Sequence, residues 1–555
     1  MRKVFALTLA LCLVLSVMTF ASAEGTTFDL TACIASEPET LDPTLASSVD
    51  GATYTMHMFE GLMKYVSLGT PVGDDDSVMS VETTYGQAAS YAASDDGLTY
   101  TFTLRDGIVW SDGQPVTAQD FVYSWQRLVD PANAADYGYL LDGIVLNASA
   151  IQGGEMTPDQ LGVSAPDDKT FVVTLEAQTP YFLSLCAFAT LMPLRQDVIE
   201  ANEDWTQPGV MVSNGAYVIS EWTHDSYIKM AKNPSYYDTA AIGPDTITWY
   251  LSDSETSILA AYQAGEYDFM NSIPTDQIAT LKASGDAFTV PQLGTYYLYI
   301  NCEQITDWRV RAAIDLSIDR DNIVENVTQG GQSPATGLVP KGIMLSDNAE
   351  WTSVMGEAMY APLAAMYPDA DLTTYFGRCE LAQQLLSEAV ADGFDASVTL
   401  DYAFNTSESH KAIAEAVQSD VYNVLGLNCT LSNSEWQTYT NNLAEGGFAL
   451  ARLGWIADYN DAVTYLDMFV NGGSYNYGRW VNDDYTALIA QIKALPAGAE
   501  RDQLMEQAEQ MLFSEGGFTV APIYFYTSNY CLHEGVNNVM WTPLGYYFFM
   551  YATQG

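Results

Sequence analysis

The chain has 555 residues, and its 70 acidic residues against 20 basic residues give a formal net charge of −50. The length allows three to four domains of roughly 150 residues each, and an aromatic content of 12% argues against an intrinsically disordered protein. The excess of acids excludes the basic face that nucleic-acid binding requires, and it equally disfavours binding to anionic lipid headgroups.

The N-terminal segment predicts a secretory signal peptide. Arg2 and Lys3 are followed by an apolar stretch over residues 4–20 and by Ala-Ser-Ala, which predicts cleavage after Ala23. A membrane anchor would lack the cleavage site. Lipid attachment at Cys12 is not expected, because a leucine precedes it where a small residue is needed. We therefore expect an exported protein that is periplasmic, extracellular or at the cell surface.

The cysteines and histidines indicate no metal site and no cofactor. No CxxC or HExxH spacing is present. Six cysteines follow the predicted signal peptide, at Cys33, Cys186, Cys302, Cys379, Cys429 and Cys531. In an exported protein these could form disulfides, and buried free thiols are an equally good interpretation.

Several elements can be predicted from local pattern. Residues 98–104 alternate as a strand does, and residues 117–128 predict a helix in which Thr117 and Asp120 form a capping box. A second helix is expected over residues 380–391, before a glycine.

A β-α-β unit is predicted in the second half of the chain. Residues 398–404 are strand-like, Ser407 precedes a helix that Gly426 ends, and residues 427–431 resume a strand. This pattern indicates an α/β domain with a largely buried sheet.

Asp458 is the most informative acid. It follows a strand predicted over residues 448–455 and lies near Trp455. A carboxylate at the end of a strand could hold a ligand ammonium group through a charge-assisted hydrogen bond. From spacing alone, an aspartate that only shapes its own turn is the favoured interpretation.

Arg452 shares strand parity with Gly454, Ile456 and Asp458. Six extended residues separate the two charges by at most ~20 Å. An acid and a base facing one groove would suit a zwitterionic ligand, whereas an arginine in an acid-rich protein is more often a structural ion-pair partner.

No catalytic template is found. There is no GxSxG elbow, no P-loop and no GxGxxG after a strand. Seventy acids make chance carboxylate pairs inevitable, so an exported hydrolase with paired carboxylates stays an alternative that sequence alone cannot support.

Seven segments in fixed order resemble one known family over nearly the whole mature chain. The segments are EPETLDP (37–43), FEGL (59–62), LTYTFTLRDGIVWSDGQPVTAQDFVYSWQRLVDP (98–131), TPYF (179–182), NGAY (214–217), DWRVRAAIDLSIDRD (307–321) and GWIADYND (454–461). The chain thereby resembles the extracytoplasmic solute-binding proteins of ABC importers, family 5, and within it the oligopeptide-binding proteins.

The resemblance implies an α/β, periplasmic-binding-protein-like fold of two lobes, with an extra domain inserted in the first lobe. The expected division is signal peptide 1–23, lobe I over 24–59, 195–293 and 528–555, inserted domain II over 60–194, and lobe III over 294–527.

The resemblance also implies the ligand-binding residues. Asp458 matches the position that pairs with a peptide α-amino group, which reverses the interpretation drawn from spacing. Arg452 and His410 match positions near the peptide carboxylate. Backbone pairing as flanking strands is expected from Gly454, Trp455 and Ile456 and, on the opposite lobe, from Ala46, Ser47, Ser48 and Val49. The chamber lining is expected to include Tyr137, Trp436 and Trp455.

The chain departs from the family pattern at the carboxylate end. Leu443 stands where an arginine is common, and a carboxylate-contacting lysine is missing near residues 326–332. Ser47 replaces an acid. We expect amine recognition to be retained and selection by peptide length to differ.

The expected function is a non-enzymatic receptor that closes around a short peptide and delivers it to a membrane ABC permease with cytoplasmic ATPase subunits. It is expected to be a monomer with no nucleic-acid partner. The alternatives are an oligosaccharide, nickel-chelate or haem ligand, and a signalling rather than a nutrient peptide. The acids other than Asp458 are expected to form a solvated coat.

Overall fold

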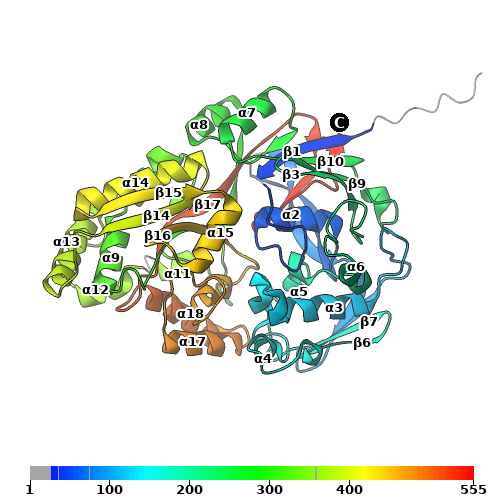
Figure 1. Ribbon diagram of the computed structural model, residues 1–555, viewed down its shortest axis with the longest axis horizontal. Helices are drawn as coiled ribbons and strands as arrows, with labels where there is room; N and C mark the ends of the chain where they lie inside the picture. The colour runs from blue at the N-terminus through cyan, green and yellow to red at the C-terminus, as the bar shows by residue number, and fades with distance from the viewer. Residues whose placement is uncertain (1–26, 36, 74, 357–358) are drawn as a thin grey trace, which may run out of the picture.

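The computed structural model describes residues 27–35, 37–73, 75–356 and 359–555, so the predicted signal peptide and Cys12 lie outside the described residues. The chain forms two lobes that lie side by side (Figure 1). Within the described ranges, no helix is both long and apolar enough to cross a membrane. The described cysteines are free thiols, four of them buried.

An eleven-stranded sheet runs through both lobes. Its strands, in spatial order, are β15 (Asn428–Ser434), β14 (Thr399–Asn405), β16 (Leu450–Ile456), β12 (Phe288–Ile300), β17 (Val520–Leu532), β11 (Phe269–Met270), β1 (Asp29–Ala35), β10 (Thr246–Leu251), β9 (Tyr227–Lys232) and β8 (Tyr217–Thr223), with β13 (Ser333–Pro334) beside β17. The two long strands β12 and β17 pair with each other and pass from one lobe to the other (Figure 1). A rotation of one lobe against the other must therefore bend these two strands.

Three smaller sheets complete the β structure. They are β2 (Met63–Val72), β3 (Asp75–Tyr85), β19 (Val539–Trp541) and β20 (Tyr547–Phe548); β4 (Ala88–Ala93), β5 (Thr99–Leu104), β7 (Thr170–Thr174) and β6 (Val163–Asp167); and the pair β18 (Val536–Asn537) and β21 (Thr553–Gln554). Because β19 pairs with β3, the C-terminal segment returns to the N-terminal lobe.

The α-helices cover the sheets from both lobes. They are α2 (Val49–Met58), α3 (Ala118–Val129), α4 (Ala148–Gln152), α5 (Phe182–Leu185), α6 (Gln196–Ala201), α7 (Glu255–Gln263), α8 (Thr275–Ser284), α9 (Trp308–Ser317), α10 (Arg320–Asn322), α11 (Trp351–Met355), α12 (Ala361–Met366), α13 (Tyr375–Ala391), α14 (Glu408–Leu425), α15 (Trp436–Glu445), α16 (Val463–Leu466), α17 (Asp483–Lys493) and α18 (Ala499–Leu512). In Figure 1, α9, α13 and α14 lie with β14–β16 in one lobe, and α2 lies under β1 and β10 in the other.

The helix starts follow the predicted capping chemistry. The Asp120 carboxylate accepts a hydrogen bond at 2.8 Å from the backbone N–H of Thr117, which precedes α3. Ser407 caps α14, and Gly426 ends it with φ of 70°. Helix α13 begins at Tyr375, five residues earlier than predicted, because the Thr374 hydroxyl caps it there. The β14-α14-β15 unit has parallel strands, as predicted.

Two large hydrophobic cores divide the molecule. One joins the sheets of the N-terminal lobe to the β4–β7 region, with residues as distant as Leu30, Trp125 and Phe549 in one cluster. The other fills the lobe built on β12, β14 and β16. Since the first core is continuous across the segment predicted as an inserted domain, that segment and the N-terminal lobe form one body.

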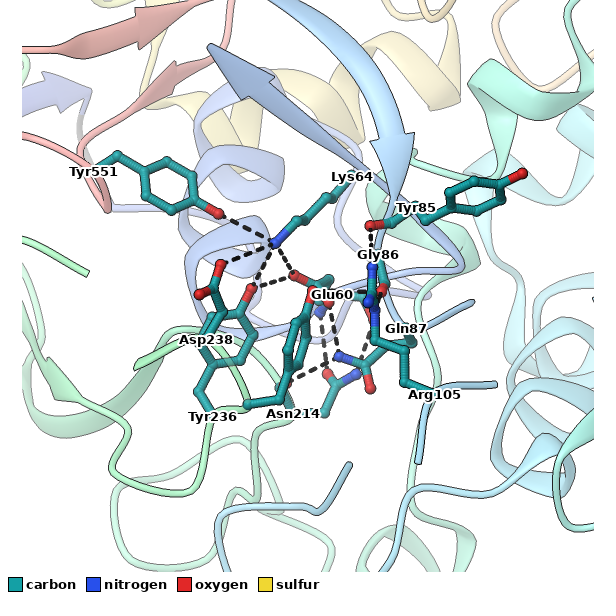
Figure 2. Close-up of polar contacts among 11 residues, drawn as sticks. Glu60, Lys64, Tyr85, Gly86, Gln87, Arg105, Asn214, Tyr236, Asp238 and Tyr551 are labelled. Carbon is teal, nitrogen blue, oxygen red and sulfur yellow. Dashed lines mark hydrogen bonds and ion pairs between the residues drawn. The ribbon is translucent and has the colours of Figure 1, made fainter. Parts of the chain in front are cut away.

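A polar cluster, called here the junction cluster, reinforces that body (Figure 2). The Glu60 carboxylate lies 3.4 Å from the Lys64 ammonium group and accepts a hydrogen bond at 2.9 Å from Gln87 Nε2 and another from the Tyr236 hydroxyl. The Asn214 side chain bonds both the N–H and the carbonyl of Glu60. Glu60 and Lys64 pair with each other, and the side chains around them come from distant parts of the sequence, so the cluster ties these segments together.

Candidate ligand-binding cavity

The cavity between the lobes consists of three adjoining chambers. The Asp458 chamber is small, about 20 Å³, the middle chamber is about 380 Å³, and the Arg452 chamber is about 440 Å³. Val49 from α2 and Ile456 from β16 line all three chambers. The three chambers therefore form one elongated space along β16.

The wall of this space is an exposed strand edge. Strand β14 pairs with β16 only at Leu450 and Ala451, and in the described residues no strand pairs with that edge of β16 beyond Ala451. Gly454 lies in this open part. A Cβ atom there would collide with the Tyr526 ring and hydroxyl, so any other residue would force Tyr526 to move. An unpaired edge on a cavity wall can accept an extended chain as an added strand.

Asp458 lies just beyond β16 and is only 4% exposed. Its two carboxylate oxygens accept hydrogen bonds at 3.0 Å from the hydroxyls of Tyr137 and Tyr139, which come from the other body. The Thr464 hydroxyl lies 3.4 Å away. Among the described residues no lysine, arginine or histidine forms an ion pair with Asp458. Burial raises its pKa from 3.8 to about 7, although the tyrosine hydroxyls oppose the shift.

Arg452, in the strand β16, is 8% exposed. Its Nη1 donates a hydrogen bond at 2.7 Å to Asn405 Oδ1, and its guanidinium carbon lies 5.0 Å from the centre of the Tyr296 ring. Its buried Nε has no hydrogen-bond partner in the part of the chain that the structure describes, and no described carboxylate forms an ion pair with the group. Arg452 nevertheless lines the cavity as a cation without a described counter-charge.

His410 lines the same chamber as Arg452. Its Nδ1 lies 3.5 Å from the Tyr296 hydroxyl. Burial, followed by the charge of Arg452, lowers the pKa of His410 well below 6.5, so the ring is neutral at physiological pH. A neutral imidazole can accept or donate a hydrogen bond beside the guanidinium.

The segment opposite β16 differs from the predicted flanking strand. Ser48 is extended, with φ of −111° and ψ of 156°, but Val49 begins helix α2, for which Ser48 is the cap. The prediction of an extended Val49 was wrong because the Ser48 hydroxyl accepts the Gly51 N–H and starts the helix there. The N–H groups of Ser47 and Ser48 are bonded to the Glu39 carboxylate.

The remaining predicted residues lie on the chamber walls. Ala46 lines the Asp458 chamber, Trp455 lines the middle chamber, Tyr137 lines both of these, and Trp436 lines the two large chambers. The structure thus brings all the predicted residues to one cavity. Sequence reasoning missed Tyr139, Asn405, Tyr475 and Tyr526; of these, Tyr139 could have been found as the second tyrosine of the Tyr-x-Tyr pair at 137–139.

Side-chain contacts join the two bodies. The rings of Tyr181 and Tyr459 stack with centroids 4.0 Å apart. On the other side, the hydroxyls of Ser407 and Ser409 donate to the Glu255 carboxylate at 2.8 and 2.7 Å. These contacts connect the two bodies directly, in addition to the strands that pass between them.

A family model decides the assignment. Residues 82–477, more than half of the chain, match the model for bacterial extracellular solute-binding proteins, family 5, middle region. The chain belongs to this family. It is a solute-binding receptor of the ABC-import type and not an enzyme.

Curated relatives support the family over almost the full length. The oligopeptide-binding protein OppA of Bacillus subtilis is 33% identical over 530 residues, which are 94% of this chain and 91% of the relative. The probable deoxycholate-binding periplasmic protein YgiS of Escherichia coli is 34% identical over 501 residues, covering 88% of this chain and 86% of the relative. The names show that relatives at 33% and 34% identity are described with different ligands.

Solved structures confirm the two-lobe α/β fold. Haemophilus influenzae OppA in complex with the peptide RPPGFSPFR is similar with a TM-score of 0.84 and 29% identity, covering 96% of this chain and 99% of that one. MppA, a periplasmic murein tripeptide-binding protein, has a TM-score of 0.61 in its unliganded open form, at 31% identity with 96% and 98% covered. The lobes of this chain are therefore arranged more as in the peptide complex than as in that open form.

Proposed function

We propose that this protein binds short peptides between its two lobes and delivers them to an ABC permease. The peptide lies extended along β16, with its α-ammonium group at Asp458 and its carboxylate toward Arg452. The observation that carries the proposal is the placement of two buried charges of opposite sign, neither with a counter-charge among the described residues, at the two ends of one cavity.

The chemistry of the wall supports a peptide over other ligands. The unpaired edge of β16 offers main-chain hydrogen bonds that any peptide can satisfy regardless of its side chains. The large chambers on either side leave room for side chains of different sizes. Such a design binds the backbone strongly and tolerates variation in sequence.

Export and transfer complete the proposal. The predicted signal peptide, cleaved after Ala23, would release a monomeric receptor outside the cytoplasm. Closure through β12 and β17 would bring together the faces of both lobes that a permease can recognise, so that only the ligand-bound form docks. The permease and its ATPase subunits are inferred from the family.

Among the described residues, a ligand anion finds a counter-charge only at the Arg452 end of the cavity. Asp458 closes one end, and the middle chamber is lined by Glu39, Asp50 and Asp136 without a basic residue. Carboxylates without counter-charges repel a ligand anion. The structure of the cavity therefore favours a ligand with at least one positive charge.

The test is to identify what the protein retains. Mass spectrometry of the denatured, freshly purified protein should detect peptides, and after their removal by partial unfolding and refolding, calorimetry should show binding of trialanine at pH 7. Deoxycholate is the matched control and should not compete. Retention of a bile acid or sugar, together with no heat from any peptide of two to five residues, would overturn the proposal.

A further inference from the structure

The middle chamber carries a charge pattern of its own. Three carboxylates line it, from Glu39, Asp50 and Asp136, and no lysine or arginine does. Within the described residues, none of the three takes part in an ion pair. The wall of this chamber is therefore negative over the part of the cavity that adjoins β16.

Local structure holds each acid in place. The carboxylate of Glu39 is fixed by the backbone N–H groups of Ser47 and Ser48. Asp50 lies in the first turn of α2, and Asp136 begins a 3₁₀ helix at Asp136–Leu141. Removal from water by the surrounding protein and then the charge of Glu39 raise the pKa of both Asp50 and Asp136, so Glu39 acts electrostatically on each of these two acids.

The arrangement does not suit a metal ion. Among the described residues, no group of three or more histidine, cysteine, aspartate or glutamate side chains could hold one. The acids are spread along the chamber and do not converge on a point. A spread of carboxylates matches an elongated organic cation better than a compact ion.

Aromatic side chains supply the second part of the site. Tyr475 lines the chamber, is 7% exposed, and has a buried hydroxyl without a hydrogen-bond partner in the described chain. Its ring lies 5.9 Å from those of both Tyr137 and Tyr477, and Trp436 lines the same chamber. Aromatic faces beside carboxylates bind the apolar stem and the charged head of a long basic side chain.

We propose that the middle chamber selects peptides with a lysine or arginine side chain at the first or second residue. The position follows from geometry, because the middle chamber shares Tyr137, Ser48 and Ile456 with the Asp458 chamber that would hold the amino terminus. The hydroxyl of Tyr475 and the carboxylates of Asp50 and Asp136 accept hydrogen bonds from the cationic head. This assignment rests on the proposed binding of peptides.

The experiment compares lysine with norleucine, which has a stem of the same length and no charge. Lysine is placed in turn at each position of an otherwise all-alanine tripeptide, and calorimetry gives the ratio of the norleucine to the lysine dissociation constants. We expect a ratio of about tenfold or more at position 1 or 2, the scale of one charge-assisted contact, and a ratio near one at position 3.

Two double variants test whether the preference for lysine over norleucine comes from the middle chamber. The double substitution Asp50→Asn and Asp136→Asn should reduce the ratio to about threefold or less, because it removes two of the three charges. The control replaces two exposed acids of the same body outside the cavity, Glu155→Gln and Asp159→Asn, and should keep the ratio of the unmodified protein. Using a ratio cancels any general loss of affinity in a variant.

The outcomes separate this assignment from the proposed function. If trialanine binds and lysine has no advantage over norleucine at any position, selection by the middle chamber is wrong while peptide binding stands. A lysine preference that persists in the Asp50 and Asp136 double variant also overturns it. If no tripeptide binds at all, the proposed function itself fails.

Discussion

The junction cluster and the ligand cavity both bury charged groups, but they treat them differently. Glu60 is 6% exposed and has Lys64 beside it, together with hydrogen bonds from neighbouring side chains (Figure 2). Asp458 is 4% exposed and is surrounded by hydroxyl groups, with no cation paired to it among the described residues. Arg452 is the reverse case, a buried cation beside an amide and a ring.

The presence or absence of a counter-charge distinguishes a carboxylate that stabilises the fold, such as Glu60, from one that is available to bind a ligand, such as Asp458. Burying a carboxylate without a counter-charge lowers the stability of the folded protein, so such a residue is not explained by a contribution to folding. A ligand that supplies the counter-charge offsets this loss of free energy when it binds. Buried charges that lack a counter-charge and also line a cavity are for this reason candidates for a functional site.

The largest effect should come from breaking the junction. Glu60→Ala removes one partner of a buried pair and should lower the free energy of unfolding by about 3–5 kcal/mol, measured by urea denaturation. Asp458→Asn keeps the shape of the side chain and removes an unpaired buried charge, so it should leave stability unchanged or raise it at pH 8. Equal losses in the two variants would remove the distinction between the regions.

The carboxylate end should show a smaller effect. Arg452→Met removes a charged donor and should weaken the binding of a free-acid tripeptide by about 1.5–3 kcal/mol, the range for hydrogen bonds to charged groups. Amidation of the peptide carboxylate should cost affinity in the unmodified protein and little in the variant. If both proteins lose the same affinity on amidation, Arg452 does not meet the carboxylate.

The pH dependence should follow the pKa of Asp458. Because that pKa is raised to about 7, the carboxyl group is protonated below pH 7 and must release its proton to pair with an ammonium group. Affinity should fall as the pH decreases from 7 to 5, by up to about tenfold per unit. Calorimetry in buffers of different ionisation enthalpy should detect the released proton.

The same raised pKa fixes the sign of the stability change. The folded protein binds the proton of Asp458 more tightly than the unfolded chain, so the contribution to stability is present below pH 3.8 and is lost as the pH rises through about 7. Relative to the unmodified protein, Asp458→Asn should become more stable as the pH rises from 4 to 7. A constant difference across that range would show that the group titrates normally.

The sequence predicted local structure well because capping and periodicity act over a few residues. The caps of α3 and α14 and the β14-α14-β15 unit follow directly from Thr117, Ser407 and Gly426. The choice of Asp458 over a turn-forming aspartate came from family resemblance, since the two tyrosine hydroxyls that bond it lie about 320 residues away along the chain. Periodicity carries no information about such contacts.

The prediction that all other acids form a solvated coat was wrong in part. Glu60, Asp315, Asp467 and Glu509 are buried. Asp315 pairs with Arg320 and Asp467 with Lys493, while Glu509 accepts hydrogen bonds from two backbone N–H groups and from a tryptophan. Composition cannot distinguish these acids from surface ones, because their partners are assembled only by the tertiary fold.

The central claim, that Asp458 binds the α-ammonium group of a peptide, is tested most directly by a double-mutant cycle. Trialanine and N-acetyl-trialanine are titrated into the unmodified protein and into Asp458→Asn at pH 7. We predict that acetylation costs about 2–5 kcal/mol in the unmodified protein, the scale for removing one partner of a buried charge pair, and far less in the variant. An acetylation cost that is the same in both proteins would contradict the claim.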